Sequence, residues 1–256
     1  MNRIKNAFSN GKAFIAFLTG GDPDYDTSLK AIRAAIEGGA DLIEIGVPFS
    51  DPIAEGVVIQ EADLRALAGG MTTDKIFDLA AEVRAQSEVA ICLMTYLNPV
   101  FHYGYEKFFA KCAQAGVDGV IIPDMPYEEK EEAAVVARTH GVDVVSLIAP
   151  TSENRIRTIA GEAEGFLYVV SSMGVTGMRA EIKTDLESIM EVVRQVQKVP
   201  AAIGFGINTP EQAKKYAAIS DGVIVGSAIV KIVEKYREEA PEHVYEYVKS
   251  MKDAIR

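Results

Sequence analysis

The chain has 256 residues, 48% of them hydrophobic and 25% charged, so it is long enough for a large α/β domain and too apolar for extended disorder. Its formal net charge of −11 excludes a protein that attracts nucleic acid or anionic membranes through its overall field. No apolar run approaches the roughly 20 residues of a membrane span, and the N-terminus lacks the apolar core of a signal peptide, so we expect a cytoplasmic protein.

The cysteines and histidines predict no metal site. Cys92 and Cys112 lie in apolar or helical contexts without ligand spacing, so we interpret them as reduced core thiols, with a disulfide as the minor alternative. His102, His140 and His243 are scattered along the chain, which argues against a metal centre or a histidine-based triad.

Short apolar runs alternate with amphipathic, alanine-rich segments, a pattern typical of βα units. Eight runs predict strands, at residues 13–19, 42–46, 90–95, 119–122, 142–148, 166–171, 201–204 and 222–225. Helices are predicted at residues 27–37, 57–67, 73–87, 105–115, 128–139, 152–160, 185–197, 209–218 and 241–255, with another directly after residue 229.

Eight βα units without a linker-like stretch predict one (β/α)8 barrel domain over residues 1–256. We expect an extra N-terminal helix and an additional helix after the second strand. An open doubly wound sheet is the structural alternative. Residues 96–104 and 172–184 are predicted loops, and the second is long enough to be a lid or a binding loop.

A glutamate interrupts the second predicted strand near its C-terminal end. Alternation along the strand puts Leu42, Glu44 and Gly46 on one side. If that side faces the barrel interior, desolvation should raise the pKa of Glu44 and suit it to proton transfer near neutrality. Asp51 and Glu55 follow on the next loop, so two or three carboxylates would overlook one pocket. The alternative is an edge strand with Glu44 facing water.

Glycines follow the seventh and eighth strands, where barrels of this kind often bind phosphate. Gly204 and Gly206 lie at the end of the seventh strand, on either side of Phe205. Gly226 follows the eighth strand and precedes Ser227 at a predicted helix start. Glycine lets backbone N–H groups approach an anion, and the helix start adds its positive dipole end. Gly174 and Gly177 on the long loop could contribute as well. The alternative is that these are ordinary turn residues.

Three aromatic residues have two possible roles. Tyr168 lies within the sixth strand and could supply a hydroxyl, although a strand tyrosine often belongs to the core. Phe17 and Phe205 could enclose a flat apolar ligand, or they could be core aromatics.

Several segments together resemble one family along nearly the whole chain, the α subunits of tryptophan synthase. They are FLTGGDP at 17–23, EIGVPFSDP at 44–52, YLNP at 96–99, GVDGVIIPD at 116–124, GVTG at 174–177, GFGI at 204–207 and GSAIV at 226–230. The resemblance implies a (β/α)8-barrel lyase that cleaves indole-3-glycerol phosphate to indole and glyceraldehyde 3-phosphate without a cofactor. It also implies an αββα complex, in which the β subunit carries pyridoxal phosphate.

The resemblance assigns roles to the two glutamates. Glu44 matches the family's catalytic acid–base. Glu55 stands where the family usually has aspartate, taken to stabilise the charge that develops at the indole N–H. The extra methylene of Glu55 displaces its carboxylate from the place that an aspartate carboxylate would take, and Val57 replaces a proline common in the family.

The resemblance assigns the remaining site residues in three groups. The residues that match the catalytic tyrosine and the indole pocket are Tyr168, Phe17 and Phe205. The phosphate and lid positions are Thr176, Gly177, Gly206, Gly226 and Ser227, with Thr176 closing on Asp51. The β-subunit surface is matched around Asp51, Asn98 and Pro126.

Three other functions stay open at this stage. Another phosphate-handling barrel, such as a phosphosugar isomerase or epimerase, would keep the glycines but would not need an indole-sized slot. A silent subunit would only activate a β partner. A free-standing lyase would release indole without one.

Overall fold

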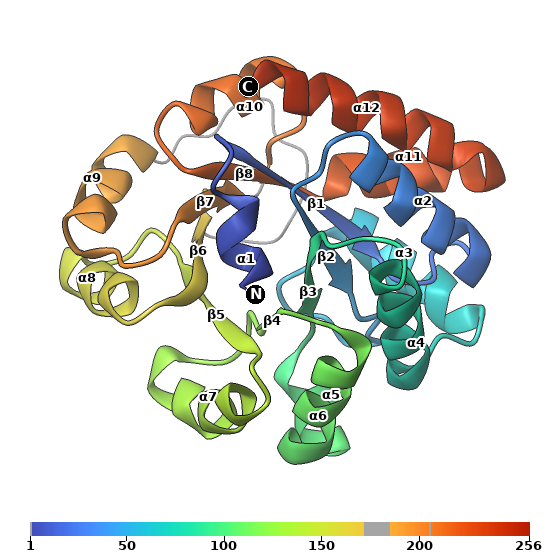
Figure 1. Ribbon diagram of the computed structural model, residues 1–256, viewed down its shortest axis with the longest axis horizontal. Helices are drawn as coiled ribbons and strands as arrows, with labels where there is room; N and C mark the ends of the chain where they lie inside the picture. Colours follow the sequence, from blue (N-terminus) through green and yellow to red (C-terminus); the bar gives the residue numbers. More distant parts are fainter. Residues whose placement is uncertain (1, 172–184, 205) are drawn as a thin grey trace.

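Eight parallel strands close into a barrel in the computed structural model, which describes residues 2–171, 185–204 and 206–256. The strands follow one another in sequence order around the barrel, and β1 pairs with both β2 and β8 (Figure 1). The predicted (β/α)8 barrel is confirmed, and the open doubly wound sheet is wrong because β1 and β8 pair directly.

The strands lie close to their predicted positions. They are β1 Ala13–Thr19, β2 Leu42–Gly46, β3 Ala90–Met94, β4 Gly119–Ile121, β5 Asp143–Ile148, β6 Glu164–Val170, β7 Ala201–Gly204 and β8 Gly222–Val225. The largest difference is at β6, which begins two residues earlier than predicted, before Gly165. Gly165 has a positive φ of 66°, which a glycine adopts without steric cost.

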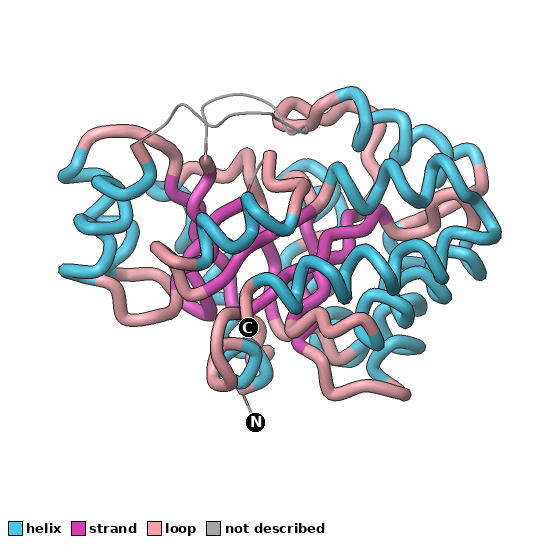
Figure 2. The backbone as a smooth tube through the Cα atoms, turned by 90° about the horizontal axis from the view of Figure 1, so that it is seen from above, coloured by secondary structure: helices cyan, strands magenta, loops and turns pink. Residues whose placement is uncertain are grey.

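The helices surround the barrel (Figure 2). They are α1 Arg3–Ala7, α2 Tyr25–Glu37, α3 Val57–Ala68, α4 Thr73–Arg84, α5 Leu97–Tyr103, α6 Tyr105–Ala115, α7 Lys130–Thr139, α8 Glu153–Gly161, α9 Leu186–Val196, α10 Pro210–Ala217, α11 Ser227–Tyr236 and α12 Ala240–Ala254. Two 3-10 turns, Tyr127–Glu129 and Arg237–Glu239, precede α7 and α12. The expected N-terminal helix is α1, and the expected additional helix after the second strand is α3.

The prediction of a loop at residues 96–104 is wrong, because α5 occupies most of it. Pro99 lies in the first turn of this helix, where its missing N–H costs nothing. The carboxylate of Asp124, in the loop after β4, accepts the N–H of Leu97 at 2.8 Å. The free backbone N–H group at the start of α5 is therefore satisfied by a residue 27 positions away in the chain. The local sequence offers no strong signal for this helix start.

The barrel interior and the helix layer form separate apolar clusters, and a third, small one holds Phe17 of β1. The interior cluster includes Ile15, Leu42, Cys92 and Phe166, and Ile4 of α1 joins it. Ile4 lies against the start of β4, so α1 closes the N-terminal end of the barrel. It crosses the barrel axis in Figure 1 and lies below the strands in Figure 2. The opposite end, where the strands finish, is left for the site.

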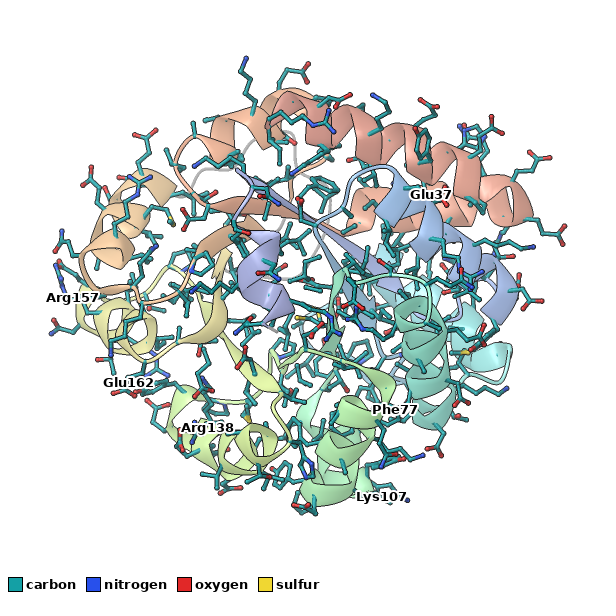
Figure 3. All side chains as sticks on the ribbon, viewed as in Figure 1. Glu37, Phe77, Lys107, Arg138, Arg157 and Glu162 are labelled. Atoms are coloured by element: carbon teal, nitrogen blue, oxygen red, sulfur yellow. The ribbon has the colours of Figure 1, made fainter. Side chains whose placement is uncertain are left out.

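Polar and apolar side chains separate across the helical ring. Phe77 of α4 is buried inside the ring, whereas Lys107 and Arg157 lie at its rim (Figure 3). Within the described ranges, no helix is long and apolar enough to cross a membrane.

Candidate active site

Glu44 lies on β2, between β1 and β3, with its side chain completely buried inside the barrel. Its neighbours across the sheet are Cys92, which belongs to the interior cluster, and Phe17, which packs in a small cluster with side chains of α3 and α11. The edge-strand alternative is wrong, because β2 is paired on both sides. Strand alternation and barrel closure together direct this carboxyl group inward.

The carboxyl group of Glu44 has no compensating contact in the described part of the chain. Neither of its oxygens has a hydrogen-bond partner there. Burial raises the pKa of Glu44 from 4.5 to about 8. The group therefore holds its proton at neutral pH and is poised to donate it. A buried carboxyl group without a partner is costly for folding, which indicates a functional role.

Tyr168 of β6 lies in the same interior space, almost fully buried. Burial raises the pKa of its phenol, and the charges of Glu44 and Glu55 raise it further. Its hydroxyl group is next to Gly204 at the end of β7, where a Cβ atom would lie 2.6 Å from the Tyr168 oxygen. Only glycine at position 204 leaves room for this ring.

Phe17 of β1 also depends on glycines at neighbouring strand ends. A Cβ atom at Gly46 would lie 2.7 Å from its Cζ atom, and one at Gly226 would lie 3.2 Å from its Cδ1 atom. Gly226, predicted from the sequence as a turn or phosphate-binding residue, thus also makes space for an aromatic wall, as does Gly46. The other expected wall residue, Phe205, lies outside the described residues.

Glu55 lies in the loop between β2 and α3, buried at the barrel mouth. The Tyr96 hydroxyl donates a hydrogen bond to its Oε1 atom at 3.3 Å and accepts the N–H of Ala54 at 2.9 Å. The side-chain amide of Gln60 donates to the backbone carbonyl of Glu55 at 2.9 Å. These contacts hold the Glu55 carboxylate near Tyr168, whose pKa it raises.

The structure adds a third buried carboxyl group that the sequence reasoning missed. Asp63 lies on the buried face of α3, and its carboxylate accepts a hydrogen bond from the backbone N–H of Phe49. Burial and the nearby charge of Glu55 raise the pKa of Asp63 to about 8. The sequence did contain a signal for this burial, because helical spacing puts Asp63 on the same face of α3 as the apolar residues Ile59 and Ala66.

The start of α11 differs from the start of α10. Thr209 and Gln212 form a complete capping box at α10. Among the described residues, α11 has no side-chain cap and no acidic residue in its first turn. It begins at Ser227, directly after Gly226. Its uncapped backbone N–H groups and positive dipole end can therefore receive an anion.

Gly206 follows β7 and the start of α11 follows β8, and these two strands are neighbours in the barrel. The φ of 88° at Gly206 requires glycine. The predicted phosphate residues Gly206, Gly226 and Ser227 are therefore brought together at one end of the barrel, partly exposed. Thr176 and Gly177, predicted to lie on the lid, fall outside the described residues.

The residues predicted to meet a partner lie around the mouth and not inside it. Asp51, Asn98 and Pro126 are all exposed. Asp51 accepts a hydrogen bond from the neighbouring Ser50 hydroxyl. In the ranges that the structure describes, no group of three or more metal-ligating side chains is found.

Together, these features define a class of protein: a (β/α)8-barrel enzyme with a protonated carboxyl acid on β2 and an uncapped helix start after β8, two strands that both neighbour β1. Comparison with known proteins gives the family. The family model for the tryptophan synthase alpha chain matches residues 4–256.

Similar sequences and solved structures indicate the same family. The tryptophan synthase alpha chain of Lacticaseibacillus casei is 47% identical over 255 residues, covering 100% of this chain and 96% of the relative. That of Caldanaerobacter subterraneus is 45% identical over 262 residues, with both chains fully covered. The alpha chain structure from Legionella pneumophila has a TM-score of 0.90 at 34% identity, covering 100% of this chain and 97% of that chain.

The chain belongs to the tryptophan synthase alpha chain family. It is a carbon–carbon lyase of tryptophan biosynthesis that cleaves indole-3-glycerol phosphate to indole and glyceraldehyde 3-phosphate.

Proposed function

We propose that Glu44 is the acid–base of this cleavage, and the observation that carries the proposal is its buried, protonated and unpartnered carboxyl group. In a retro-aldol cleavage, C3 of the indole ring gains a proton and a hydroxyl group of the glycerol chain loses one as the carbon–carbon bond breaks. One carboxyl group near neutrality can donate the first proton and accept the second.

Glu55 and Tyr168 support the indole end of the substrate in this proposal. Protonation at C3 leaves positive charge on the indole ring, and the Glu55 carboxylate would accept the ring N–H and stabilise that charge. The neutral phenol of Tyr168 and the ring of Phe17 form walls around the flat ring system. The deep burial of all three side chains favours an apolar ligand held away from water.

The phosphate group would bind at the start of α11. Gly206, Gly226 and Ser227 offer backbone N–H groups and one hydroxyl group there. On the family resemblance, we propose Thr176 as a lid residue, Gly177 as a further contact to the phosphate group, and Phe205 as the second wall of the indole pocket. This assignment requires no cofactor in the chain, since every step is a proton transfer or an electrostatic contact.

We also propose that a tryptophan synthase β subunit, carrying pyridoxal phosphate, binds at the barrel mouth. One similar structure, with a TM-score of 0.87 and 34% identity, is a tryptophan synthase complex from Pyrococcus furiosus; it covers 95% of this chain and 99% of that chain. Ile53 and Phe101 are 74% and 71% exposed near Asp51, Asn98 and Pro126. Large exposed apolar side chains rimmed by polar ones favour a protein interface.

Two further assignments complete the proposal. We propose that residues 1–256 are one barrel domain, supported by the direct pairing of β1 with β8. A cytoplasmic location is supported by the two buried, unpaired thiols of Cys92 and Cys112.

The test is indole production from indole-3-glycerol phosphate by the wild type and by Glu44→Gln. The variant keeps the size of the side chain but cannot donate a carboxyl proton, so turnover should fall at least about 100-fold. Substrate binding, measured by calorimetry, should be retained. Glu37→Gln, an exposed glutamate of α2, is the control and should keep full turnover. Unchanged turnover in Glu44→Gln would refute the assignment.

Two measurements address the remaining assignments. Adding a β subunit should increase indole turnover if the barrel mouth is its binding surface, and Phe101→Asp should weaken that effect. Glu55→Asp restores the family's usual residue. Unchanged turnover would show that the loop accommodates the extra methylene of Glu55.

A further inference from the structure

A cavity of about 350 Å³ lies beside the C-terminal end of β5, between α7 and α8. Its walls are mostly apolar and come from the loop after β4, the start of α7, β5 and the loop that follows it, α8 and the end of β6, with Ala54 of the loop between β2 and α3 at one side. Glu44, Phe17 and Ser227 are absent from its described lining. The volume is at the lower end of the range for small-molecule sites.

One cationic side chain is buried in the wall of this cavity. Lys130, the first residue of α7, is only 8% exposed. Its Nζ atom donates a hydrogen bond to the Ser146 hydroxyl of β5 at 3.0 Å. The carboxylate of Glu164 lies 3.9 Å from the same Nζ atom, beyond hydrogen-bond distance. An ammonium group has three donors, and Ser146 satisfies one of them.

Most of the neighbouring charged groups bind other partners, and the Oε2 atom of Glu164, which is in ion-pair range of Lys130, accepts no hydrogen bond from the described residues. The Oε1 atom of Glu164 accepts a hydrogen bond from Arg138 at 2.9 Å, and Arg138 also binds Glu131. At the rim of the cavity, Arg155 binds both carboxylate oxygens of Glu128, at 2.6 and 3.0 Å. The ion pairs on this flank therefore leave Lys130 facing an apolar cavity with incomplete compensation.

A buried ammonium group is stabilised by an anion that brings both charge and hydrogen-bond acceptors. The apolar walls, which include Ile122, Leu147 and Val170, suit a hydrocarbon body attached to that anion. We propose that this cavity binds a small organic carboxylate with an apolar body, whose carboxylate is held by Lys130 and Ser146. This site goes beyond the lyase activity and does not depend on it.

The test compares two probes of similar shape on the full chain, 4-phenylbutyrate and the uncharged 4-phenylbutan-1-ol, by isothermal titration calorimetry. The carboxylate should bind at least about tenfold more tightly than the alcohol, because a charge-assisted hydrogen bond is stronger than a neutral one. Lys130→Met should remove that difference while leaving the affinity for the alcohol unchanged. Ser146→Ala should weaken carboxylate binding by a smaller factor.

Lys107→Met is the matched control, since Lys107 is exposed on α6 at the rim of the molecule (Figure 3). It should bind both probes as the wild type does. Without probe, Lys130→Met should cleave indole-3-glycerol phosphate at the wild-type rate, which checks its fold. The proposal is overturned by equal affinity for the two probes, by carboxylate binding that survives Lys130→Met, or by no carboxylate binding up to about 10 mM.

Discussion

The burial of Glu44 predicts an unusual dependence of stability on pH. Its pKa is raised from 4.5 to about 8 in the folded state. Below pH 4.5 the folded and unfolded states both hold the proton, and the group has no effect. As pH rises from 4.5 to 8, the unfolded chain releases the proton and the folded chain keeps it. The free energy of unfolding therefore falls across this window and levels off above it.

The magnitude follows from the size of the pKa change. At about 1.4 kcal/mol per pH unit, the full effect is about 5 kcal/mol. Between pH 5 and pH 8 it is roughly 3 to 4 kcal/mol, since part of the change lies below pH 5. Glu44→Gln has no titrating group at this position. The stability of the variant relative to the wild type should therefore increase by this amount between the two pH values.

The assay is urea denaturation followed by far-ultraviolet circular dichroism, because the chain contains no tryptophan to serve as a fluorescent probe. Both proteins are measured at pH 5, 6, 7 and 8. The control is Glu37→Gln, whose exposed side chain in α2 should shift stability by less than about 0.5 kcal/mol at every pH. Parallel pH profiles for the wild type and Glu44→Gln would refute the reasoning.

Three further predictions concern other parts of the barrel. Thr209→Ala removes one half of the α10 capping box, and urea denaturation should show a loss of about 1 kcal/mol. Ile4→Ala leaves a cavity where α1 closes the barrel, and the same measurement should show a loss of roughly 2 to 5 kcal/mol. Gly204→Ala places a methyl group against the Tyr168 hydroxyl, and it should cost roughly 1 to 3 kcal/mol and lower indole turnover in a steady-state assay.

Each of these has a clear contrary result. Full stability of Thr209→Ala would show that solvent replaces the cap. Full stability of Ile4→Ala would show that α1 does not close the barrel in solution. Wild-type turnover by Gly204→Ala would show that Tyr168 can move without affecting the site.

The position of Glu44 illustrates what could be predicted before the structure. Alternation along residues 42–46 placed Glu44 on one face of a strand, and the count of eight βα units predicted a barrel into which that face could point. The structure decided that this face points inward. The glycines near residues 206 and 226 were predicted at the phosphate end for the same topological reason. These inferences depend on the alternation of side chains along a strand and on the order of strands and helices, and both can be read from the sequence.

Other features needed the folded chain. The helix at 97–103 is capped by Asp124, and Glu55 is held by Tyr96, so both depend on residues distant in sequence. Asp63 was overlooked because its raised pKa comes from burial and from the charge of Glu55.

The sequence by itself determined the number and order of the strands, and with them the end of the barrel at which the site lies. Only the tertiary structure decided which side chains are desolvated and which have partners. Desolvation and pairing depend on groups that approach through space, such as Lys130 with Ser146 or Tyr168 with Gly204. The charge state of Glu44, on which its chemistry depends, is therefore a property of the closed barrel.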